Sequence, residues 1–298
     1  MTVATAQRVR PTRSPWTVLA VGVLAASLSP IFIRYAEDAP ALAVSLYRCV
    51  LGALLLLPFA WKRLRQMTAR DFLFPGVAGA FLAIHFASWI TSLHLTSVAA
   101  SVVLVSTTPI FVAGASRVLF GDRLSPLGWS GIVLGLAGTA LISGGSTGGS
   151  SLRGDLLALT GGAMAAGYFL STQRARRTLG IMEYAVATYG TAAIILAVMC
   201  AIGRVELTGY DGQTWWAIAA IVLIPQLLGH TLINVVLKDI DATTVAMTVM
   251  VEPVLATVLA FFLFSETPAA LVYPGGVAVL VGIYLVTTLK REIPVVVE

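Results

Sequence analysis

Two apolar stretches of this chain carry polar side chains at helical spacing. One set falls at i, i+3, i+4 and i+7 and the other at i, i+4 and i+8, so each set shares one face of a helix. The sets are His85, Ser88, Trp89 and Ser92, and Gln226, His230 and Asn234. Polar groups are costly in an apolar environment unless they meet a partner, a cavity or a ligand. The pattern predicts two walls of a central substrate path; the alternative is a pair of faces that hydrogen-bond between helices.

Two ionisable residues, Arg48 and Glu252, also lie deep in apolar stretches. A buried carboxylate tends to be protonated or paired, so Glu252 could relay protons, bind a substrate ammonium or neutralise a basic residue. Arg48 is the natural group to bind a carboxylate, either from Glu252 or from a substrate. Thr108 matches Glu252 at a distance of 144 residues, and we include it in the site. Tyr168 offers an aromatic ring that could stack on a planar substrate or pack against neighbours.

The sequence lacks motifs for catalysis: it has no GxGxxG loop, no Walker phosphate loop and no HExxH zinc motif. Cys49 and Cys200 both lie in apolar stretches, and they predict neither a disulfide nor a metal site. His85 and His230 could form the paired groups of a membrane-embedded enzyme, but no nucleophile or ligand set accompanies them. We expect no enzymatic activity, no cofactor and no metal.

Membrane-spanning helices must position these groups. The chain is 58% hydrophobic and 11% charged, with a mean hydropathy of +0.90. A soluble domain carries about 25% charged residues. A bilayer core of ~30 Å needs about 20 apolar residues per helix. This rule predicts ten spans, at about residues 15–36, 41–61, 72–93, 97–119, 126–144, 154–173, 180–202, 214–237, 242–264 and 269–289.

A repeat with an offset of 144 residues divides these spans into two halves. Thr108–Asp122 reads Thr-Pro-Ile … Leu-Phe-Gly-Asp and matches Glu252–Glu266, which reads Glu-Pro-Val … Leu-Phe-Ser-Glu. The same offset pairs Gly131 with Gly275 and Gly138 with Gly282. Five spans per half is an odd number, so the halves must enter the membrane in opposite orientations, as in many transporters. We expect halves at residues 1–145 and 152–290, a Gly/Ser-rich linker at 143–151 and a cytoplasmic tail at 291–298.

Helix-breaking and small residues recur inside the spans. Pro30, Pro109, Pro225 and Pro253 each remove a backbone hydrogen bond and should kink their helix. Pro109 and Pro253 are repeat-related, which favours hinges that flex in both halves over static kinks. The glycine faces of the fifth and tenth spans allow close helix contact, either within the bundle or between two copies of the chain. Both a monomer and a homodimer fit this pattern.

Basic residues are placed asymmetrically about the predicted spans. Of the 19 Lys and Arg residues, all fall on one side except Arg34, Arg48, Arg153 and Arg204. The positive-inside rule puts that side, and both termini, in the cytoplasm. The net charge of +5 is thus a topology signal, and because it is spread over short loops we expect no nucleic-acid partner. The expected partners are the lipid bilayer and a small-molecule substrate.

These features resemble the EamA type of the drug/metabolite transporter superfamily, over about Trp16 to Leu289. The residues that carry the resemblance are the twin proline segments ending in Asp122 and Glu266, and Arg48 in the second span. Within the family the chain looks most like the YddG-like exporters of aromatic amino acids. The resemblance implies a basket-like bundle whose cavity is lined by spans one, three, four, six, eight and nine. Glu252 departs from the small or apolar residue that is usual before this proline.

The sequence therefore predicts a bacterial inner-membrane permease that exports aromatic and other neutral amino acids, and related metabolites, by alternating access. Arg48 and Glu252 would match the charges of a zwitterion. A nucleotide-sugar or sugar-phosphate transporter of the same superfamily is the alternative. Such substrates carry at least two negative charges, yet the spans offer only Arg48 and Arg34. A membrane-embedded enzyme and a scaffold without a solvent-filled cavity are the alternatives from other classes.

Overall fold

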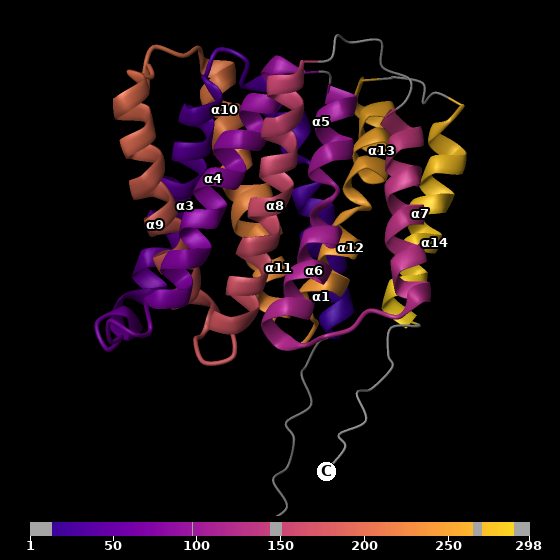
Figure 1. Ribbon diagram of the computed structural model, residues 1–298. Coiled ribbons are helices and arrows are strands. Elements are labelled where there is room, and N and C mark those ends of the chain that lie inside the picture. The colour runs from indigo at the N-terminus through magenta and orange to yellow at the C-terminus, as the bar shows by residue number, and fades with distance from the viewer. Residues whose placement is uncertain (1–13, 97, 144–150, 265–269, 289–298) are drawn as a thin grey trace, which may run out of the picture.

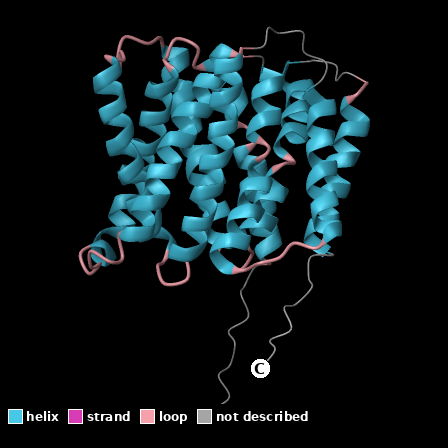
Figure 2. Ribbon diagram, in the orientation of Figure 1, coloured by secondary structure: helices cyan, strands magenta, loops and turns pink. Residues whose placement is uncertain are grey.

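Helices account for the regular structure of this protein. Figure 2 shows helices joined by loops, and no strand, in the residues that the computed structural model describes, 14–96, 98–143, 151–264 and 270–288. The helices lie roughly parallel to one another, as Figure 1 shows. They are α1 (Pro15–Ala26), α2 (Ser29–Tyr35), α3 (Ala41–Leu64), α4 (Leu73–Leu95), α5 (Val98–Val105), α6 (Thr108–Phe120), α7 (Pro126–Ser143), α8 (Leu152–Ala175), α9 (Ile181–Gly203), α10 (Gly212–Ile221), the π-helix η1 (Val222–His230), α11 (Thr231–Val236), α12 (Ala242–Val249), α13 (Glu252–Phe264) and α14 (Val272–Thr288).

Several of these helical segments suit a membrane. Six are long and apolar enough to cross one: Pro15–Tyr35, Ala41–Leu64, Leu73–Leu95, Ala100–Phe120, Ile181–Gly203 and Gly212–Val236. Three shorter apolar helices accompany them, at Pro126–Ile142, Ala242–Leu255 and Val272–Thr288. The prediction of an all-α protein with several membrane spans is confirmed. The Gly/Ser-rich linker and the tail at 291–298 fall largely or wholly outside the described residues.

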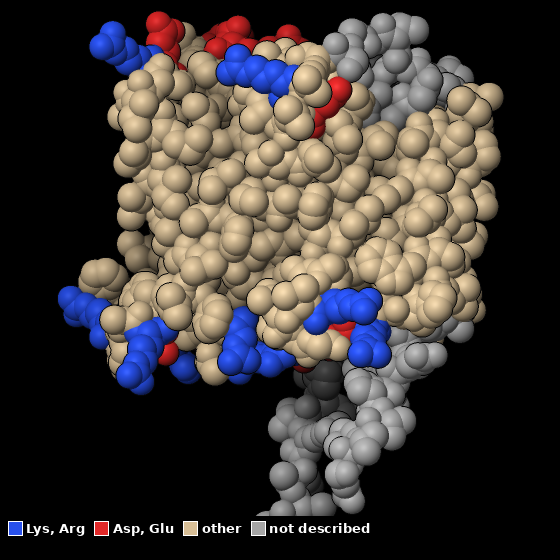
Figure 3. Space-filling model, in the orientation of Figure 1, with Lys and Arg blue, Asp and Glu red and all other residues tan. Residues whose placement is uncertain are grey.

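The outer surface has the charge pattern of a membrane protein. In Figure 3 a broad band without charged side chains separates two charged rims, and Lys and Arg side chains gather along the lower rim. The loops that follow α3, α6, α8 and α11 lie at this end (Figure 1) and carry Arg65, Arg70, Arg123, Arg177 and Lys238. Large apolar side chains are exposed on these helices, such as Phe262 of α13 at 75% and Ile194 of α9 at 69%. Exposed apolar surface of this extent fits contact with lipid and not with water.

Each of the four prolines singled out in the sequence lies at an irregular stretch of helix. Pro30 follows the break between α1 and α2, Pro109 follows the break between α5 and α6, and Pro253 follows the break between α12 and α13. Pro225 lies inside η1. Proline has no N–H to donate and its ring clashes with the carbonyl one turn earlier. Pro58 differs, since α3 continues through it without a break.

Threonine hydroxyls replace the hydrogen bonds lost at the α5–α6 break. The hydroxyl of Thr107 donates to the carbonyl of Leu104 at 2.6 Å, and that of Thr108 donates to the carbonyl of Val105 at 2.8 Å. The Thr108 hydroxyl also lies 3.1 Å from the carbonyl oxygen of Gly162 on α8. Free carbonyl groups inside an apolar bundle need such partners. The break is therefore a satisfied, stable feature of the helix pair.

The fifth and tenth predicted spans pack against each other inside the bundle. A Cβ atom at Gly131 of α7 would lie 2.8 Å from the carbonyl oxygen of Gly282 of α14, and one at Gly138 would lie 2.5 Å from that of Gly275. The contact is reciprocal, because Cβ atoms at Gly275 and Gly282 would meet the carbonyl oxygens of Gly138 and Gly131 at 2.7 Å and 2.5 Å. These four glycines thus join two antiparallel helices of one chain.

A methyl group at this contact should destabilise the protein. In Gly138→Ala the new Cβ meets backbone atoms that have no room to move, and overpacking of this kind costs about 1–3 kcal/mol. We expect a lower apparent melting temperature for the purified protein in detergent. Gly114→Ala is the matched control, because a Cβ there meets nothing within 4 Å. Equal melting temperatures for the two variants would contradict the close α7–α14 contact.

Candidate functional site

A fully buried arginine lies among the central helices. Arg48 of α3 has 0% of its side chain exposed. Its Nε donates to Oε1 of Gln226 in η1 at 2.9 Å. Its guanidinium carbon lies 3.8 Å from the centre of the Phe86 ring of α4, a cation–π contact. The two terminal nitrogens, Nη1 and Nη2, are buried and have no hydrogen-bond partner among the described residues. One edge and one face of the guanidinium are thus occupied, and the outer edge is free.

Further aromatic rings adjoin the Phe86 ring that covers this guanidinium. The ring of Phe86 meets that of His230 edge-on, with centres 5.4 Å apart and planes at 89°. His85 lies beside Phe86 at 5.2 Å and is stacked on Trp89 at 5.9 Å, with planes 8° apart. Nδ1 of His85 lies 2.9 Å from the carbonyl oxygen of Gly161 on α8. One histidine from each predicted stripe thus lies against the same phenylalanine.

Several polar atoms of this cluster have no hydrogen-bond partner in the described part of the chain. Besides the two Arg48 nitrogens, they are Nε1 of Trp89, Nε2 of Gln226 and Nδ1 of His230. Arginine, tryptophan and the amide nitrogen of glutamine can only donate. The unpaired groups are thus mostly donors, and an acceptor such as a carboxylate is their natural complement. We name this cluster, made of Arg48, Phe86, Trp89, Gln226 and His230, the central cluster.

A second group of polar residues is fully paired. The hydroxyl of Tyr168 on α8 donates to Oδ1 of Asn234 on α11 at 2.7 Å. The amide nitrogen of Asn234 lies 3.5 Å from the hydroxyl of Tyr189, which lies 3.1 Å from the hydroxyl of Thr231. Nε of Arg176 donates to the carbonyl of Asn234 at 3.2 Å. Tyr168 also faces His230, with ring centres 6.3 Å apart, so this paired network adjoins the central cluster.

Three predicted site residues use their hydroxyls locally. Ser88 donates to the carbonyl of Ile84 at 2.6 Å, and Ser92 to that of Trp89 at 2.6 Å. The Ser92 hydroxyl is also 2.6 Å from that of Ser101 on α5. Thr108 is held at the α5–α6 break, as described above. Of the first stripe, His85 and Trp89 therefore connect to His230 of the second stripe through Phe86. The hydroxyls of Ser88, Ser92 and Thr108 instead form hydrogen bonds with nearby backbone or with neighbouring helices.

Glu252 lies at the first position of α13, beside the break that precedes it, and its side chain is half-buried. The sequence offered it as a partner for Arg48. However, the Arg48 terminal nitrogens form no hydrogen bond to any described residue, Glu252 included.

Comparison with known proteins decides the family. The profile of the EamA-like transporter family matches residues 14–144 and 152–288. The chain belongs to the EamA-like transporter family. It is therefore a multi-pass membrane transporter, as the sequence predicted.

The relatives of this EamA-like transporter are themselves transporters by name. YdfC of Bacillus subtilis, named an uncharacterized transporter, is 25% identical over 245 residues, which cover 80% of this chain and 79% of YdfC. An uncharacterized transporter of Archaeoglobus fulgidus is 23% identical over 292 residues, 92% of this chain and 98% of that protein. YedA of Escherichia coli K12, named an uncharacterized inner membrane transporter, is 27% identical over 195 residues, 64% of this chain and 62% of YedA.

The fold is shared with a solved structure. A chain described as the crystal structure of a protein matches this one with a TM-score of 0.78 and 20% identity, and the match covers 93% of this chain and 97% of that one. At this identity the likeness concerns the fold alone.

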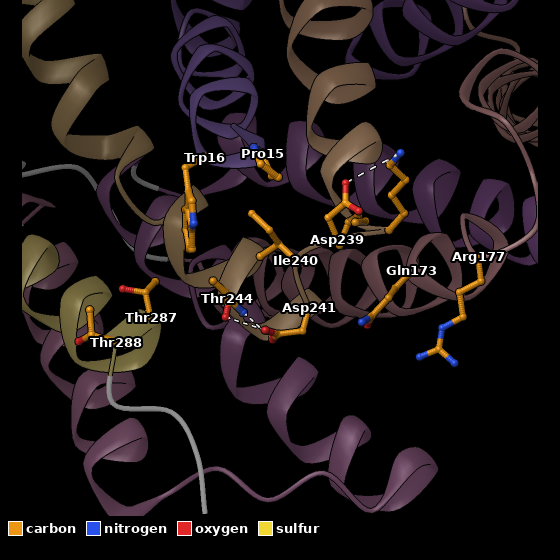
Figure 4. A pocket seen from close by; sticks show the side chains of 12 residues that line it. Pro15, Trp16, Gln173, Arg177, Asp239, Ile240, Asp241, Thr244, Thr287 and Thr288 are labelled. Carbon is orange, nitrogen blue, oxygen red and sulfur yellow. Dashed lines mark hydrogen bonds and ion pairs between the residues drawn. The ribbon is translucent and has the colours of Figure 1, made fainter. Parts of the chain in front are cut away.

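This EamA-like transporter has an open pocket at its basic end. Its volume is about 570 Å³, and α1, α8, α12, α14 and the loop after α11 line it (Figure 4). Lys238 and Asp239 approach each other to 4.0 Å at its edge, and Asp241 caps α12 by accepting from the backbone N–H of Thr244. Gln173 belongs to it and lies on the helix that carries Tyr168. The pocket and the paired network thus share α8.

Sequence reasoning missed Phe86 and Tyr189. Phe86 is fully buried and touches Arg48 and both histidines. An isolated phenylalanine in an apolar span gives no signal, because lipid-facing and ligand-facing rings look alike in sequence. Tyr189 likewise gave no signal in the sequence, although its hydroxyl is part of the paired network.

Removal of the Tyr168 hydroxyl should weaken the paired network. In Tyr168→Phe the side-chain oxygen of Asn234 loses a bond of 2.7 Å in a buried setting, and an unpaired buried group costs about 1–3 kcal/mol. We expect a lower apparent melting temperature in detergent. Tyr284→Phe, at a tyrosine that is 60% exposed, is the matched control and should melt like the unmodified protein. A Tyr168→Phe protein as stable as this control would show that the bond contributes nothing.

Proposed function

We propose that this EamA-like transporter exports aromatic and other neutral amino acids, and related metabolites, from the bacterial cytoplasm by alternating access. The observation that carries the proposal is the central cluster, in which unpaired donors and aromatic rings lie together in the interior of a membrane bundle. Polar groups at such depth mark substrate paths in membrane proteins. Transport needs no catalytic step, and the proposal includes none. Within the family, this activity corresponds to the YddG-like exporters.

The charge of the cluster favours a zwitterion as the substrate. Arg48 supplies one positive charge, and Glu252, at the first position of α13, supplies a carboxyl group. A neutral amino acid carries one charge of each sign and could be matched by these two residues. A nucleotide sugar or sugar phosphate carries at least two negative charges, and the central cluster offers one guanidinium. The rings of Phe86, Trp89 and Tyr168 would suit an aromatic side chain.

We further propose that ten spans form two inverted five-helix repeats in one basket-like bundle. Three observations support this architecture. The α5–α6 pair and the α12–α13 pair have the same bounds after a shift of 144 residues. The family profile matches the two halves as separate segments. The reciprocal Gly131–Gly282 and Gly138–Gly275 contacts are what a two-fold axis between antiparallel repeats would produce.

The broken helices are the proposed moving parts. The breaks next to Pro109 and Pro253 are repeat-related, and those residues directly follow Thr108 and Glu252. Pro225 precedes Gln226 within a π-helix, a form that is rare and common at functional sites. Bending at these points, and at Pro30, would open the cluster first to one side of the membrane and then to the other.

The substrate proposal is tested by counterflow. Purified protein in liposomes loaded with unlabelled L-phenylalanine should accumulate external radiolabelled L-phenylalanine, because exchange through a substrate path needs no other driving force. Liposomes with heat-denatured protein are the control. Exchange of a nucleotide sugar in the same vesicles, with none of phenylalanine, leucine or threonine, would overturn the proposal in favour of the alternative substrate class.

Orientation is the second test. We propose an inner-membrane location with both termini in the cytoplasm, because basic side chains gather at the end where α1 begins and α14 ends. After Cys49 and Cys200 are replaced by alanine, Gln66→Cys and Thr208→Cys place one thiol in the α3–α4 loop and one in the α9–α10 loop, at opposite ends of the bundle (Figure 1).

An impermeant maleimide should label the Thr208→Cys protein in intact cells, and the Gln66→Cys protein only after permeabilisation. Both side chains are exposed, so unequal labelling reports the side of the membrane and not burial. The reverse pattern would invert the proposed orientation.

A further inference from the structure

We propose that the terminal nitrogens of Arg48, Nη1 and Nη2, bind the carboxylate of the transported molecule. Phe86 and Gln226 would hold the guanidinium group in the orientation that this binding requires. The inference rests on the proposed function, since it concerns the same site. It adds the chemical class that the site requires, a molecule with a free carboxylate, and it predicts that amines of the same shape are excluded.

The geometry leaves one direction for a ligand. Gln226 occupies the Nε side of the guanidinium at 2.9 Å, and the Phe86 ring covers one face at 3.8 Å. Nη1 and Nη2 form the remaining edge, and both are buried without a partner in the ranges that the structure describes. Two parallel N–H groups on one edge match the two oxygens of a carboxylate, which is why arginine is favoured at such sites.

Neutralisation of Glu252 does not account for this arrangement. If Arg48 served only to balance that carboxylate, its terminal nitrogens should contact it, because a buried ion pair needs direct hydrogen bonds to offset desolvation. Instead the contacts that Arg48 makes are to an amide oxygen and an aromatic ring, which hold its orientation but leave its charge unmatched.

Most of the unpaired buried polar atoms belong to this cluster: five of the seven in the described residues lie in it, and the other two are the hydroxyl oxygens of Ser29 and Thr188. Tyr168, Tyr189, Thr231 and Asn234 bond to one another a short distance away. Nε1 of Trp89 and Nε2 of Gln226, like the Arg48 edge, have no partner in the described structure. Both are donors, so they would add to the recognition of an acceptor and contribute nothing to binding an ammonium.

Competition in the unmodified protein tests the inference without any variant. Counterflow of radiolabelled L-phenylalanine is measured against 3-phenylpropionate, which lacks the ammonium, and phenethylamine, which lacks the carboxylate. We expect 3-phenylpropionate to compete and phenethylamine to need at least about tenfold higher concentration for the same inhibition. Equal competition by phenethylamine and L-phenylalanine would overturn the inference.

Three variants test the roles of the residues. Arg48→Lys keeps the charge but loses the paired donors, Phe86→Leu removes the ring face, and Gln226→Glu places a competing carboxylate at the Nε side. We expect each to raise KM for L-phenylalanine, about tenfold or more for Arg48→Lys, with a smaller change in the maximal rate. Arg34→Lys, at an exposed arginine in the last turn of α2, is the matched control and should keep the original KM.

The outcomes separate this inference from the proposed function. If amino acids are exchanged but Arg48→Lys keeps its KM, the carboxylate inference is wrong and the exporter proposal stands. If no amino acid is exchanged, melting temperatures decide: stabilisation by 3-phenylpropionate in the unmodified protein, and not in Phe86→Leu or Gln226→Glu, would support the inference alone. Absence of stabilisation there would overturn it. The melting curves also show directly whether each variant is folded.

Discussion

Burial of the Arg48 charge inside an apolar bundle is the constraint on which the rest of this structure depends. An arginine does not lose its proton in proteins, so its charge must be held by neighbours wherever it is placed. Here a glutamine oxygen and a phenylalanine ring hold one edge and one face, and the other edge has no partner among the described residues. Three helical elements, α3, α4 and η1, must keep their relative positions for this to work.

Irregular stretches of helix place polar groups in the interior of the bundle. A regular helix hides its backbone groups, whereas an interrupted one exposes carbonyls and re-aims side chains. Thr108 and Glu252 stand at the two repeat-related breaks, and Gln226 and His230 belong to the π-helix that follows α10. The satisfied carbonyls at the α5–α6 break show that such an interruption can be stable. In the proposed mechanism, the same positions take part in both binding and bending.

Sequence patterns predicted the parts of this structure that follow from hydropathy, from helical spacing and from the missing N–H of proline. Hydropathy predicted the helices, spacing placed His85 with Trp89 and Gln226 with His230, and the missing proline N–H predicted the irregular stretches. Spacing could not tell which polar groups form hydrogen bonds within their own helix. Ser88 and Ser92 were therefore predicted to line the substrate path together with Trp89, although their hydroxyls donate to carbonyls of the preceding turn. Phe86 was missed because its role comes from a cation that lies 38 positions earlier in the chain and meets it only through packing. The sequence singled out Arg48 as a deeply placed charge, but it did not predict the contacts with Gln226 and Phe86 that the structure shows.

A structure of the protein with L-phenylalanine bound tests the central claim most directly. The account predicts carboxylate oxygens at about 2.7–2.9 Å from Nη1 and Nη2 of Arg48, the usual length of charge-assisted bonds, with Gln226 and Phe86 still holding the guanidinium. Density for the amino acid elsewhere in the bundle, with the Arg48 terminal nitrogens bonded to Glu252, would contradict it.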